Sequence, residues 1–460
     1  MEEILESLDY ELLTYLAKKT RVDSGRIIDD VRQKLSLGTI SNIENRKGKI
    51  SYKTLSQYFT CLSLSKETIV QKIHHIKKEI QDLTFQLELV QVILDERNIE
   101  KAKIILDNIQ IEEFHPLAAR IKYLYGRLFY VEKDFKQAQD LFFEVIECYE
   151  KNNYFQPNYL IECFNSLSTS FYYQEDIPNA LKYVNLGFQH YAESESNQDL
   201  KYLLTVNKVL YLIAMGQREL AFELIQQIWG QIREVEPVNV KLNFYKFRAQ
   251  LLKHAKQFQE AISCAEEGIQ IARKYKDRNR SFGLLIVLGT IYTDIEDFEK
   301  AKTCFQTVEQ FEDMKYPRRF VDAHVYLGII HSKQEEWKKA EYHLSIAQQF
   351  GEKYFIDVRR LVKLLIVYGN IMMNQKKYEQ ALSYFEIAYK KAINKSLTDF
   401  QHDVLFHKLK CLQETGKMDE FHQVNIEFFQ IQEKLYQREE MNTYESAGYS
   451  FTINRVGGGD

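Results

Sequence analysis

A short stretch near the N-terminus carries the side chains best suited to contact DNA. Between Lys18 and Lys53, ten basic residues stand against four acidic ones, although the whole chain has a net charge of −4. If Ile40 and Ile43 face the core of a short helix, its hydroxyl and amide side chains point outward, where they can reach base edges or phosphates. The candidate DNA-contacting residues are Arg32, Thr39, Ser41, Asn42, Arg46, Lys47 and Lys49.

The remaining reactive side chains are too scattered to predict catalysis. The six cysteines include no Cys-x-x-Cys pair, and the eleven histidines are dispersed without a cysteine or carboxylate at metal-binding spacing. The sequence has no glycine-rich phosphate loop and no nucleophile elbow. We therefore expect a binding protein rather than an enzyme, with no cofactor and no bound metal.

An internal repeat of about forty residues runs through most of the chain. It is marked by a recurrent alanine, with a large side chain three residues before it, an apolar residue four after it and, in four units, a glycine twelve before it. Small residues at fixed offsets are required where two antiparallel helices approach within about 8–10 Å. The repeat alanines are Ala102, Ala138, Ala180, Ala221, Ala261, Ala301, Ala340 and Ala381, with Phe421 in the equivalent place of a ninth unit.

Certain first-helix positions of each predicted hairpin are candidates for ligand binding. A single hairpin leaves one face unburied, so the units stack into a superhelix. The unit resembles the tetratricopeptide repeat, and this resemblance implies that the first helices line the concave face. The inward positions fall about 18, 15 and 11 residues before the repeat alanine. They carry amides that pair with an extended peptide backbone, cations that pair with a carboxylate, and an apolar stripe. The candidate peptide-binding residues are Arg120, Tyr123, Arg127, Asn165, Thr169, Leu203, Val206, Asn243, Lys246, Gln250, Lys363 and Asn370.

The composition and the N-terminal sequence restrict the fold class and the cellular compartment. Only 5 of the 460 residues are proline and 18 are glycine, which favours an all-α chain. The acidic N-terminus resembles no signal peptide, and no apolar run has the length of a membrane span. With its unpaired cysteines, this predicts a cytoplasmic protein without membrane contact.

The N-terminal fragment also resembles a known motif. Thr39-Ile40-Ser41-Asn42-Ile43-Glu44-Asn45 is similar to the recognition helix of phage-repressor-like helix-turn-helix regulators, with Ser36 and Ser51 as helix caps. We expect a helix over residues 26–35 before it, joined by a turn that is short for that family. The alternative is a degenerate helical cap that does not bind DNA.

The repeat itself resembles the tetratricopeptide repeat, although the usual unit has about 34 residues; the alternative is an unrelated helical solenoid. Together, a repressor-like motif and about nine such repeats are similar to the peptide-pheromone receptors of the Rap–Npr–Plc–Prg group. The resemblance implies an all-α protein with an N-terminal helix-turn-helix domain followed by a right-handed superhelix of about nine helical hairpins. It further implies a short signalling peptide in the groove, double-stranded DNA as a second partner, and a homodimer.

These observations predict four segments: a DNA-binding domain over 1–64, a linker helix over 65–81, the repeat domain over 82–441 and a flexible tail over 442–460. The predicted function is a cytoplasmic quorum-sensing receptor whose peptide ligand changes DNA binding. Two alternatives stay open at this point: a protein-interaction scaffold, and a receptor that binds a response regulator without binding DNA.

Overall fold

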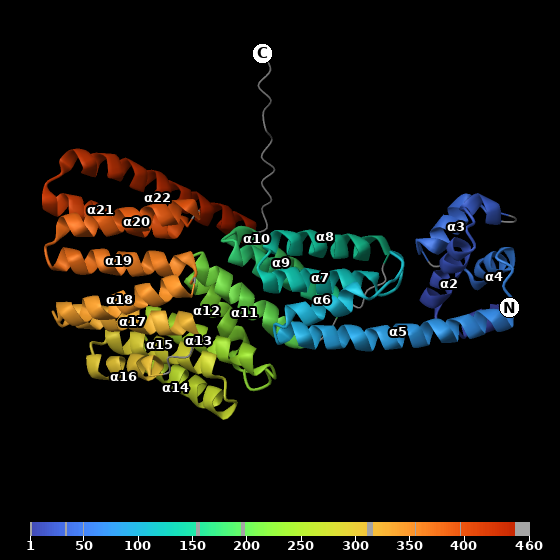
Figure 1. Ribbon diagram of the computed structural model, residues 1–460, viewed down its shortest axis with the longest axis horizontal. Helices are drawn as coiled ribbons and strands as arrows, with labels where there is room; N and C mark the ends of the chain where they lie inside the picture. The colour runs from blue at the N-terminus through green and yellow to red at the C-terminus, as the bar shows by residue number, and fades with distance from the viewer. Residues whose placement is uncertain are drawn as a thin grey trace, which may run out of the picture. The chain divides into compact units, whose positions relative to one another are not determined.

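The computed structural model describes residues 2–32, 35–48, 50–152, 157–194, 198–310, 316–354, 356–395 and 397–446. These residues form twenty-two α-helices and one short 3-10 helix, and they include no strand. The chain divides into two compact units, Met1–Leu224 and Ile225–Asp460. Each unit is built from helices that follow one another as antiparallel neighbours (Figure 1).

The helices of the N-terminal unit begin with a small cluster and continue into hairpins. They are α1 (Glu2–Glu6), α2 (Tyr10–Asp23), η1 (Ile28–Val31), α3 (Leu37–Glu44), α4 (Tyr52–Cys61), α5 (Lys66–Asp95), α6 (Ile99–Asp107), α7 (Ala118–Glu132), α8 (Phe135–Asn152), α9 (Pro157–Tyr173), α10 (Ile177–Ser194), α11 (Gln198–Ala214) and α12 (Arg218–Trp229), whose last residues belong to the second unit.

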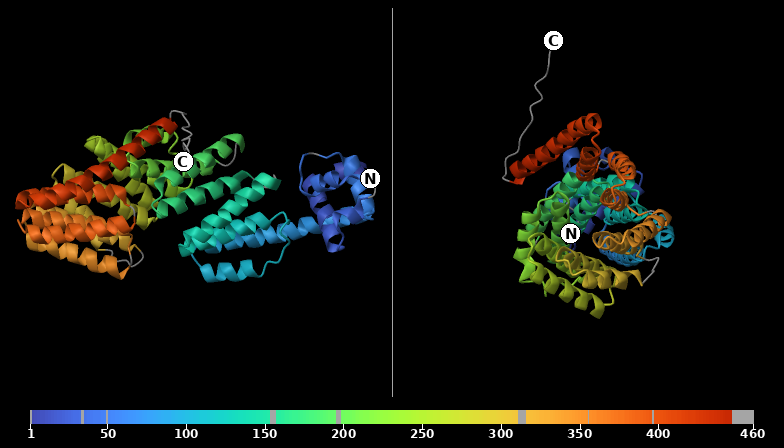
Figure 2. Two further views of the ribbon diagram at one scale, coloured as in Figure 1. Left: turned by 90° about the horizontal axis from the view of Figure 1, so that it is seen from above. Right: turned by 90° about the vertical axis from the view of Figure 1, so that its left-hand side faces the viewer.

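The C-terminal unit consists of further helix pairs, which lie side by side in both views of Figure 2. They are α13 (Val238–His254), α14 (Phe258–Lys274), α15 (Arg278–Asp294), α16 (Phe298–Glu309), α17 (Pro317–Lys333), α18 (Trp337–Lys353), α19 (Val358–Asn374), α20 (Tyr378–Asn394), α21 (Thr398–Thr415) and α22 (Met418–Ser446). The last helix thus includes residues 442–446 of the predicted tail, and the rest of that tail lies outside the described residues.

The predicted repeat register is confirmed. From α5 to α22 the helices form nine consecutive pairs, and every repeat alanine lies on the second helix of its pair with no exposed surface. The glycine on the first helix makes room for the apolar side chain four residues after the alanine. A Cβ at Gly126 would lie 2.6 Å from the Phe142 ring, and one at Gly289 would lie 2.6 Å from Phe305. This close approach explains why those offsets recur.

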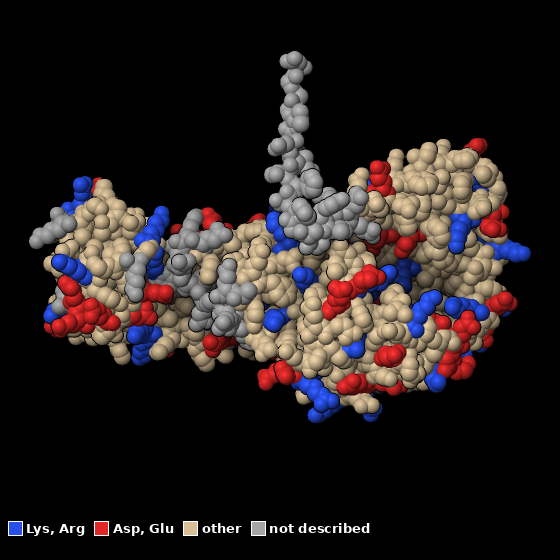
Figure 3. Space-filling model, turned by 180° about the vertical axis from the view of Figure 1, so that it is seen from behind, with Lys and Arg blue, Asp and Glu red and all other residues tan. Residues whose placement is uncertain are grey.

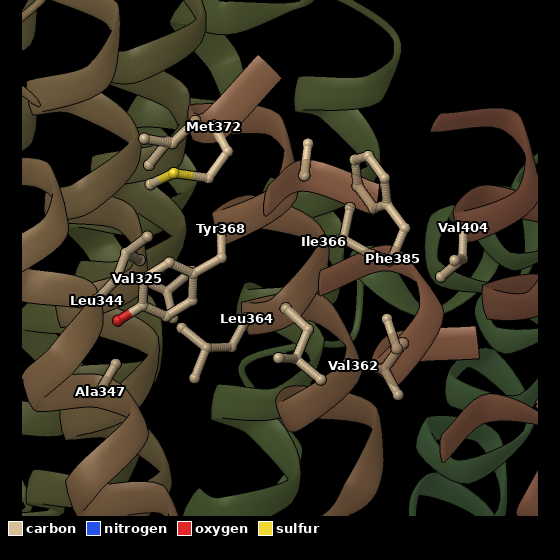
Figure 4. Close-up of a cluster of buried hydrophobic side chains, with 14 of the residues drawn as sticks. Val325, Leu344, Ala347, Val362, Leu364, Ile366, Tyr368, Met372, Phe385 and Val404 are labelled. Atoms are coloured by element: carbon tan, nitrogen blue, oxygen red, sulfur yellow. The ribbon is translucent and has the colours of Figure 1, made fainter. Parts of the chain in front are cut away.

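The core of the C-terminal unit shows what the register buries (Figure 4). Val325, Leu344 and Phe385 come from three different helices, and each has at most 4% of its surface exposed. Fully burying a side chain of this size contributes about 1.5–3 kcal/mol to folding. Because each pair shares such contacts with its neighbours, the helices of the unit are held at fixed spacing.

The N-terminal helices α1–α4 have a separate core, in which Ile40 and Ile43 are fully buried as predicted. The side chain of Ser36 caps α3 and that of Ser51 caps α4, also as predicted. The buried Glu44 carboxylate accepts hydrogen bonds from the Arg21 guanidinium at 2.6 and 2.7 Å and from the Tyr58 hydroxyl. Glu44 therefore ties α2, α3 and α4 together.

The predicted helix over residues 26–35 is wrong. Its described residues contain only the 3-10 turn η1, and Gln33 and Lys34 lie outside the described residues. The segment combines β-branched residues with Asp29 and Asp30, which are weak helix formers. The Asp30 carboxylate also accepts a hydrogen bond from the Ile27 backbone at 2.8 Å, which stabilises a turn instead.

Candidate peptide-binding surface

Three arginines occupy the same place at the start of three successive first helices. Arg280, Arg319 and Arg360 are each the third residue of α15, α17 and α19. In α15 and α19 the capping aspartate, Asp277 or Asp357, accepts a hydrogen bond from the arginine's backbone and holds its guanidinium. Tyr316 replaces the aspartate before α17, so Arg319 has no such partner.

Each arginine reaches back to the preceding first helix. The Arg280 Nε donates to the Asn239 carbonyl on α13 at 3.0 Å, and the Arg319 Nε donates to the Asn279 side chain at 3.2 Å. Arg360 forms a two-pronged contact with the Asp322 carboxylate, at 3.1 and 3.3 Å. The three guanidinium groups thus form a row across α13, α15, α17 and α19.

Two lysines extend this row, and both were predicted from the repeat register. The Lys363 ammonium donates to the Tyr326 hydroxyl at 2.7 Å and lies 4.5 Å from the centre of that ring. Lys246 is half-buried on α13. Burial, together with the positive charges of Arg319, Arg360 and Arg280, lowers the pKa of Lys246 to about 7, and Asp322 opposes this shift. Crowding of like charges marks a place where an anion is favourable.

The charges of this row do not cancel. We define the basic row as Lys246, Arg280, Arg319, Arg360 and Lys363; the carboxylates that contact it are Asp277, Asp322 and Asp357. Within the described residues, neither Lys246 nor Arg319 forms an ion pair. Figure 3 shows Lys and Arg atoms set back in a hollow of the C-terminal unit. The row therefore carries positive charge that no carboxylate of the described residues pairs with at Lys246 and Arg319.

Three predicted amides also lie on these first helices with unused hydrogen-bonding capacity. The side chains of Asn243 and Gln250 on α13 and of Asn370 on α19 are half-buried. In the described part of the chain, none of the three makes a side-chain hydrogen bond. An amide that both donates and accepts can pair with a peptide backbone.

In the N-terminal unit the predicted cations are already paired. Arg120 is 5% exposed, lies 3.9 Å from the Glu88 carboxylate and packs on the Tyr159 ring at 5.1 Å. Arg127 forms an ion pair of 2.8 Å with Asp95. Tyr123 is 1% exposed and belongs to the core of α7 and α8. The structure places Tyr123 among packing residues, because its ring packs against the Phe142 and Tyr159 rings.

The other predicted peptide-binding residues of this unit are also partly engaged in the fold. Asn165 accepts a hydrogen bond of 2.7 Å from Asn207, and Thr169 donates to the Ser166 carbonyl at 3.0 Å. Leu203 is half-buried, whereas Val206 is 3% exposed and acts as a core residue. Of these four residues, Asn165, Thr169 and Leu203 keep accessible surface and Val206 does not.

Sequence reasoning missed the arginines of the basic row. Arg280, Arg319 and Arg360 each stand twenty-one residues before the repeat alanine, one helical turn ahead of the first position considered. Their recurrence in three consecutive units was the available signal. It was missed because long side chains near a helix start reach surfaces that their own Cα positions do not face.

The predicted DNA-contacting residues are distributed over the N-terminal helices and the turn that follows. Asn42 and Lys47 are exposed, and Arg32 is exposed with Asp29 at 3.9 Å. The Thr39 hydroxyl contacts Ser36 at 2.8 Å, and the Ser41 hydroxyl accepts from Asn45 at 3.2 Å, so both are engaged inside α3. Lys49 lies outside the described residues.

Arg46 takes an unexpected orientation. It has a positive φ of 54°, and its Nε donates to the Thr14 hydroxyl on α2 at 2.9 Å. Burial lowers the pKa of this guanidinium to about 9, against the opposing charge of Glu11. Arg46 is thus held against α2, which leaves Asn42 and Lys47 as the exposed candidates of this segment.

Among the described residues, no helix combines the length and the apolar character that crossing a bilayer requires. No protein-family model and no curated protein matches the sequence.

Solved structures, in contrast, match the fold over most of the chain. A Rap protein in complex with competence and sporulation factor has a TM-score of 0.59 at 12% identity, covering 78% of this chain and 99% of that one. The apo quorum sensor NprR from B. thuringiensis gives 0.53 at 14% identity, with coverages of 76% and 99%. NprR bound to its cognate peptide NprX gives 0.50 at 16%, with 73% and 98%. The chain therefore has the all-helical, tetratricopeptide-like repeat fold of Rap and NprR, the fold that the sequence resemblance predicted.

Proposed function

We propose that this protein is a cytoplasmic receptor for a short signalling peptide, and that peptide binding changes its contact with DNA. The observation that carries the proposal is the basic row, in which Lys246 and Arg319 have no ion pair within the described residues. The unused amides Asn243, Gln250 and Asn370 lie on the same first helices. Rap and NprR, which share the fold, were each crystallised with a factor or peptide.

The chemistry assigns separate parts of the peptide to these groups. A carboxylate, either the peptide's C-terminus or an acidic side chain, accepts parallel hydrogen bonds from the free guanidinium edge of Arg319 and a charge-assisted bond from Lys246. The amides pair with the peptide backbone, which explains why an extended chain is preferred to a folded surface.

The ligand test uses a pooled library of fluorescent octapeptides with free carboxyl ends and the same library with amidated ends. We expect fluorescence polarisation to detect peptides that wild type binds and Arg319→Gln does not. Arg318→Gln is the matched control, because Arg318 is adjacent, is exposed and pairs with Asp357 at 3.5 Å. Equal binding by the two variants, or no binder in either library, would contradict the proposal.

The N-terminal helices supply the proposed output. Asn42 and Lys47 are exposed on α3 and the turn after it, where they can meet bases and phosphates of the major groove. This domain is also tied to the repeats: the Tyr15 hydroxyl and the Lys19 ammonium on α2 both donate to Glu112, just before α7. A change in the repeats can therefore shift the position of the DNA-binding helix.

In a dimer, that shift would change the distance between two DNA-binding domains. Helix α22 exposes Ile426, Phe429 and Tyr436, each about 61% exposed, on one helical face. We propose that this face pairs two copies and that peptide binding resets the spacing of their two DNA-binding domains. Light scattering after size exclusion should give a dimer, and Phe429→Glu should give a monomer.

A gel shift on the DNA upstream of the protein's own gene tests the output. Lys47→Ala should weaken binding and reduce its salt dependence, whereas Lys66→Ala, which lies at the start of α5, should not. If the gel shift detects no DNA binding, or if binding is unchanged by salt and by Lys47→Ala, the DNA part of the proposal is wrong. The peptide part is not affected by that result.

One observation favours a second candidate, a receptor that acts on a protein partner such as a response regulator. The hydroxyl groups of Thr39 and Ser41 are engaged within the helical segment, and Arg32 has an aspartate beside it. If the gel shift fails while peptide binding persists, this candidate takes the place of the regulator.

A further inference from the structure

Two histidines and a glutamate lie close together in the C-terminal unit, on helices α16, α17 and α18; His324 is buried and the other two are half-buried. Glu309 ends α16, His324 lies in the middle of α17 and His343 lies on α18. One ligand atom from each residue lies within 4.8 Å of the other two. None of these residues belongs to the basic row or to the predicted peptide-binding set.

The distances show that the group is compact and incompletely bonded. The His324 Nδ1 and His343 Nδ1 atoms are 3.0 Å apart. The Glu309 carboxylate lies 3.6 Å from the His324 Nε2 atom and 4.0 Å from the His343 Nδ1 atom. The His324 side chain is 1% exposed, and its Nε2 atom is buried with no hydrogen-bond partner in the described part of the chain. A buried polar atom without a partner calls for an explanation.

The spacing suits a small divalent transition-metal ion. Zinc bonds of about 2.0–2.1 Å in tetrahedral geometry place neighbouring ligand atoms roughly 3.3–3.4 Å apart. With His324 offering Nε2 and His343 offering Nδ1, the Glu309 oxygen lies 3.6 and 4.0 Å from the two nitrogens, slightly more than that value, and the three ligand atoms lie within 4.8 Å of one another. Two imidazoles and one carboxylate are ligands that Zn²⁺ accepts, with water in the fourth position.

The surroundings favour the form of histidine that binds metal. Burial lowers the pKa of His324 to about 3 and that of His343 to about 4, so both rings are neutral at pH 7 and offer a lone pair. The His331 ring stacks on the His343 ring at 5.3 Å, and the His331 Nδ1 atom bonds the Glu336 carboxylate. These contacts hold the orientation of the His343 ring.

We propose that Glu309, His324 and His343 bind one Zn²⁺ ion, which ties the α17–α18 hairpin to the end of α16. One imidazole presents one nitrogen to an ion, so His324 offers Nε2, its unpartnered atom, and a small rotation of the His343 ring turns its Nδ1 atom from the His324 Nδ1 atom toward the ion. The ion also provides the His324 ring with the partner that it lacks. This site is independent of the proposed peptide and DNA functions.

The test uses the full-length chain after treatment with a chelator, titrated with ZnSO4 in a calorimeter. We expect one Zn²⁺ ion per chain, and at least a tenfold loss of affinity in Glu309→Gln and in His343→Gln. Glu309→Gln removes the most exposed of the three ligands, so its fold is expected to survive, and circular dichroism checks this. His422→Gln, which removes an exposed histidine on α22, is the matched control and should bind like wild type.

Replacing Zn²⁺ with Co²⁺ gives a second readout, since the visible absorption of bound Co²⁺ reports nitrogen and oxygen ligands in a tetrahedral site. The band should be present in wild type and in His422→Gln and absent in Glu309→Gln. The proposal is overturned if wild type binds no Zn²⁺, or if the two cluster variants bind it as tightly as wild type. In either case the histidine pair is simply a buried hydrogen bond between two neutral rings.

Discussion

The two units place different side chains at corresponding positions of their first helices. In the N-terminal unit the inward cations Arg120 and Arg127 are paired with Glu88 and Asp95. In the C-terminal unit, Lys246 and Arg319 have no ion pair within the described residues. Cations of the first helices therefore serve stability in one unit and leave positive charge available in the other. The difference lies in the neighbours, since repeat register fixes direction but not burial.

Truncating Tyr123 should have the largest effect on the free energy of unfolding. Tyr123 is 1% exposed and packs against the Phe142 and Tyr159 rings, so Tyr123→Ala should lower the free energy of unfolding by about 3–5 kcal/mol. Lys246→Ala, at the equivalent place in the C-terminal unit, should raise it instead, because a half-buried cation crowded by three arginines is removed. Urea unfolding of both variants measures the contrast. Similar losses would show that the two units do not differ in this way.

Removing the Arg319 charge should have the next largest effect, on binding rather than stability. A lost hydrogen bond to a charged group costs about 1.5–3 kcal/mol, which is roughly a 10- to 150-fold weaker Kd for a peptide with a free carboxylate. Arg127→Gln, in the N-terminal unit, should leave the Kd within about twofold, since its charge is already neutralised by Asp95. Fluorescence polarisation with one selected peptide compares them. A larger loss in Arg127→Gln would move the site to the other unit.

The pH dependence of peptide binding should depend on Lys246. Its pKa is lowered to about 7, so the free protein loses this charge as pH rises through 7. A bound carboxylate favours the charged form, which makes binding take up a proton, and affinity should fall several-fold between pH 6 and pH 8. An N-acetylated peptide without histidine removes competing titrations. Lys246→Gln should abolish the pH dependence; if the dependence remains, another group is responsible.

The same pKa shift predicts a stability change of defined sign. The unfolded chain carries Lys246 protonated up to its ordinary pKa, about 10.4, whereas the folded chain releases that proton near pH 7. The unfolded state therefore binds more protons between these values, and this contribution makes the free energy of unfolding rise with pH across that window. Comparing wild type with Lys246→Gln at pH 6.5 and 9 by urea unfolding isolates it.

The sequence predicted the repeat better than the sites. The alanine and glycine offsets follow from the closest approach of two helices, which only small residues permit, so they could be read directly from the chain. The orientation of Arg46 could not, because it depends on Thr14, thirty-two residues earlier. The same holds for Glu309, His324 and His343, which tertiary packing of three helices brings together. Contacts between residues that are close in sequence were predictable. The partners of long side chains that reach another helix were not.

The turns inside the hairpins give the smallest and most direct comparison of the two units. Five residues before each repeat alanine the backbone has positive φ, at 80° in Gly216 of the N-terminal unit and 59° in Lys256 of the C-terminal unit. A side chain in this region costs about 1–2 kcal/mol, partly offset by the greater freedom of glycine in the unfolded chain. Lys256→Gly should therefore raise the free energy of unfolding by about 0.5–1 kcal/mol, and Gly216→Ala should lower it by a similar amount. Because the turn geometry is shared, opposite signs of similar size are expected from chemical denaturation of the two variants. If Lys256→Gly lowers the free energy of unfolding instead, the Lys256 side chain stabilises the C-terminal unit. Gly216 provides no such stabilisation in the N-terminal unit.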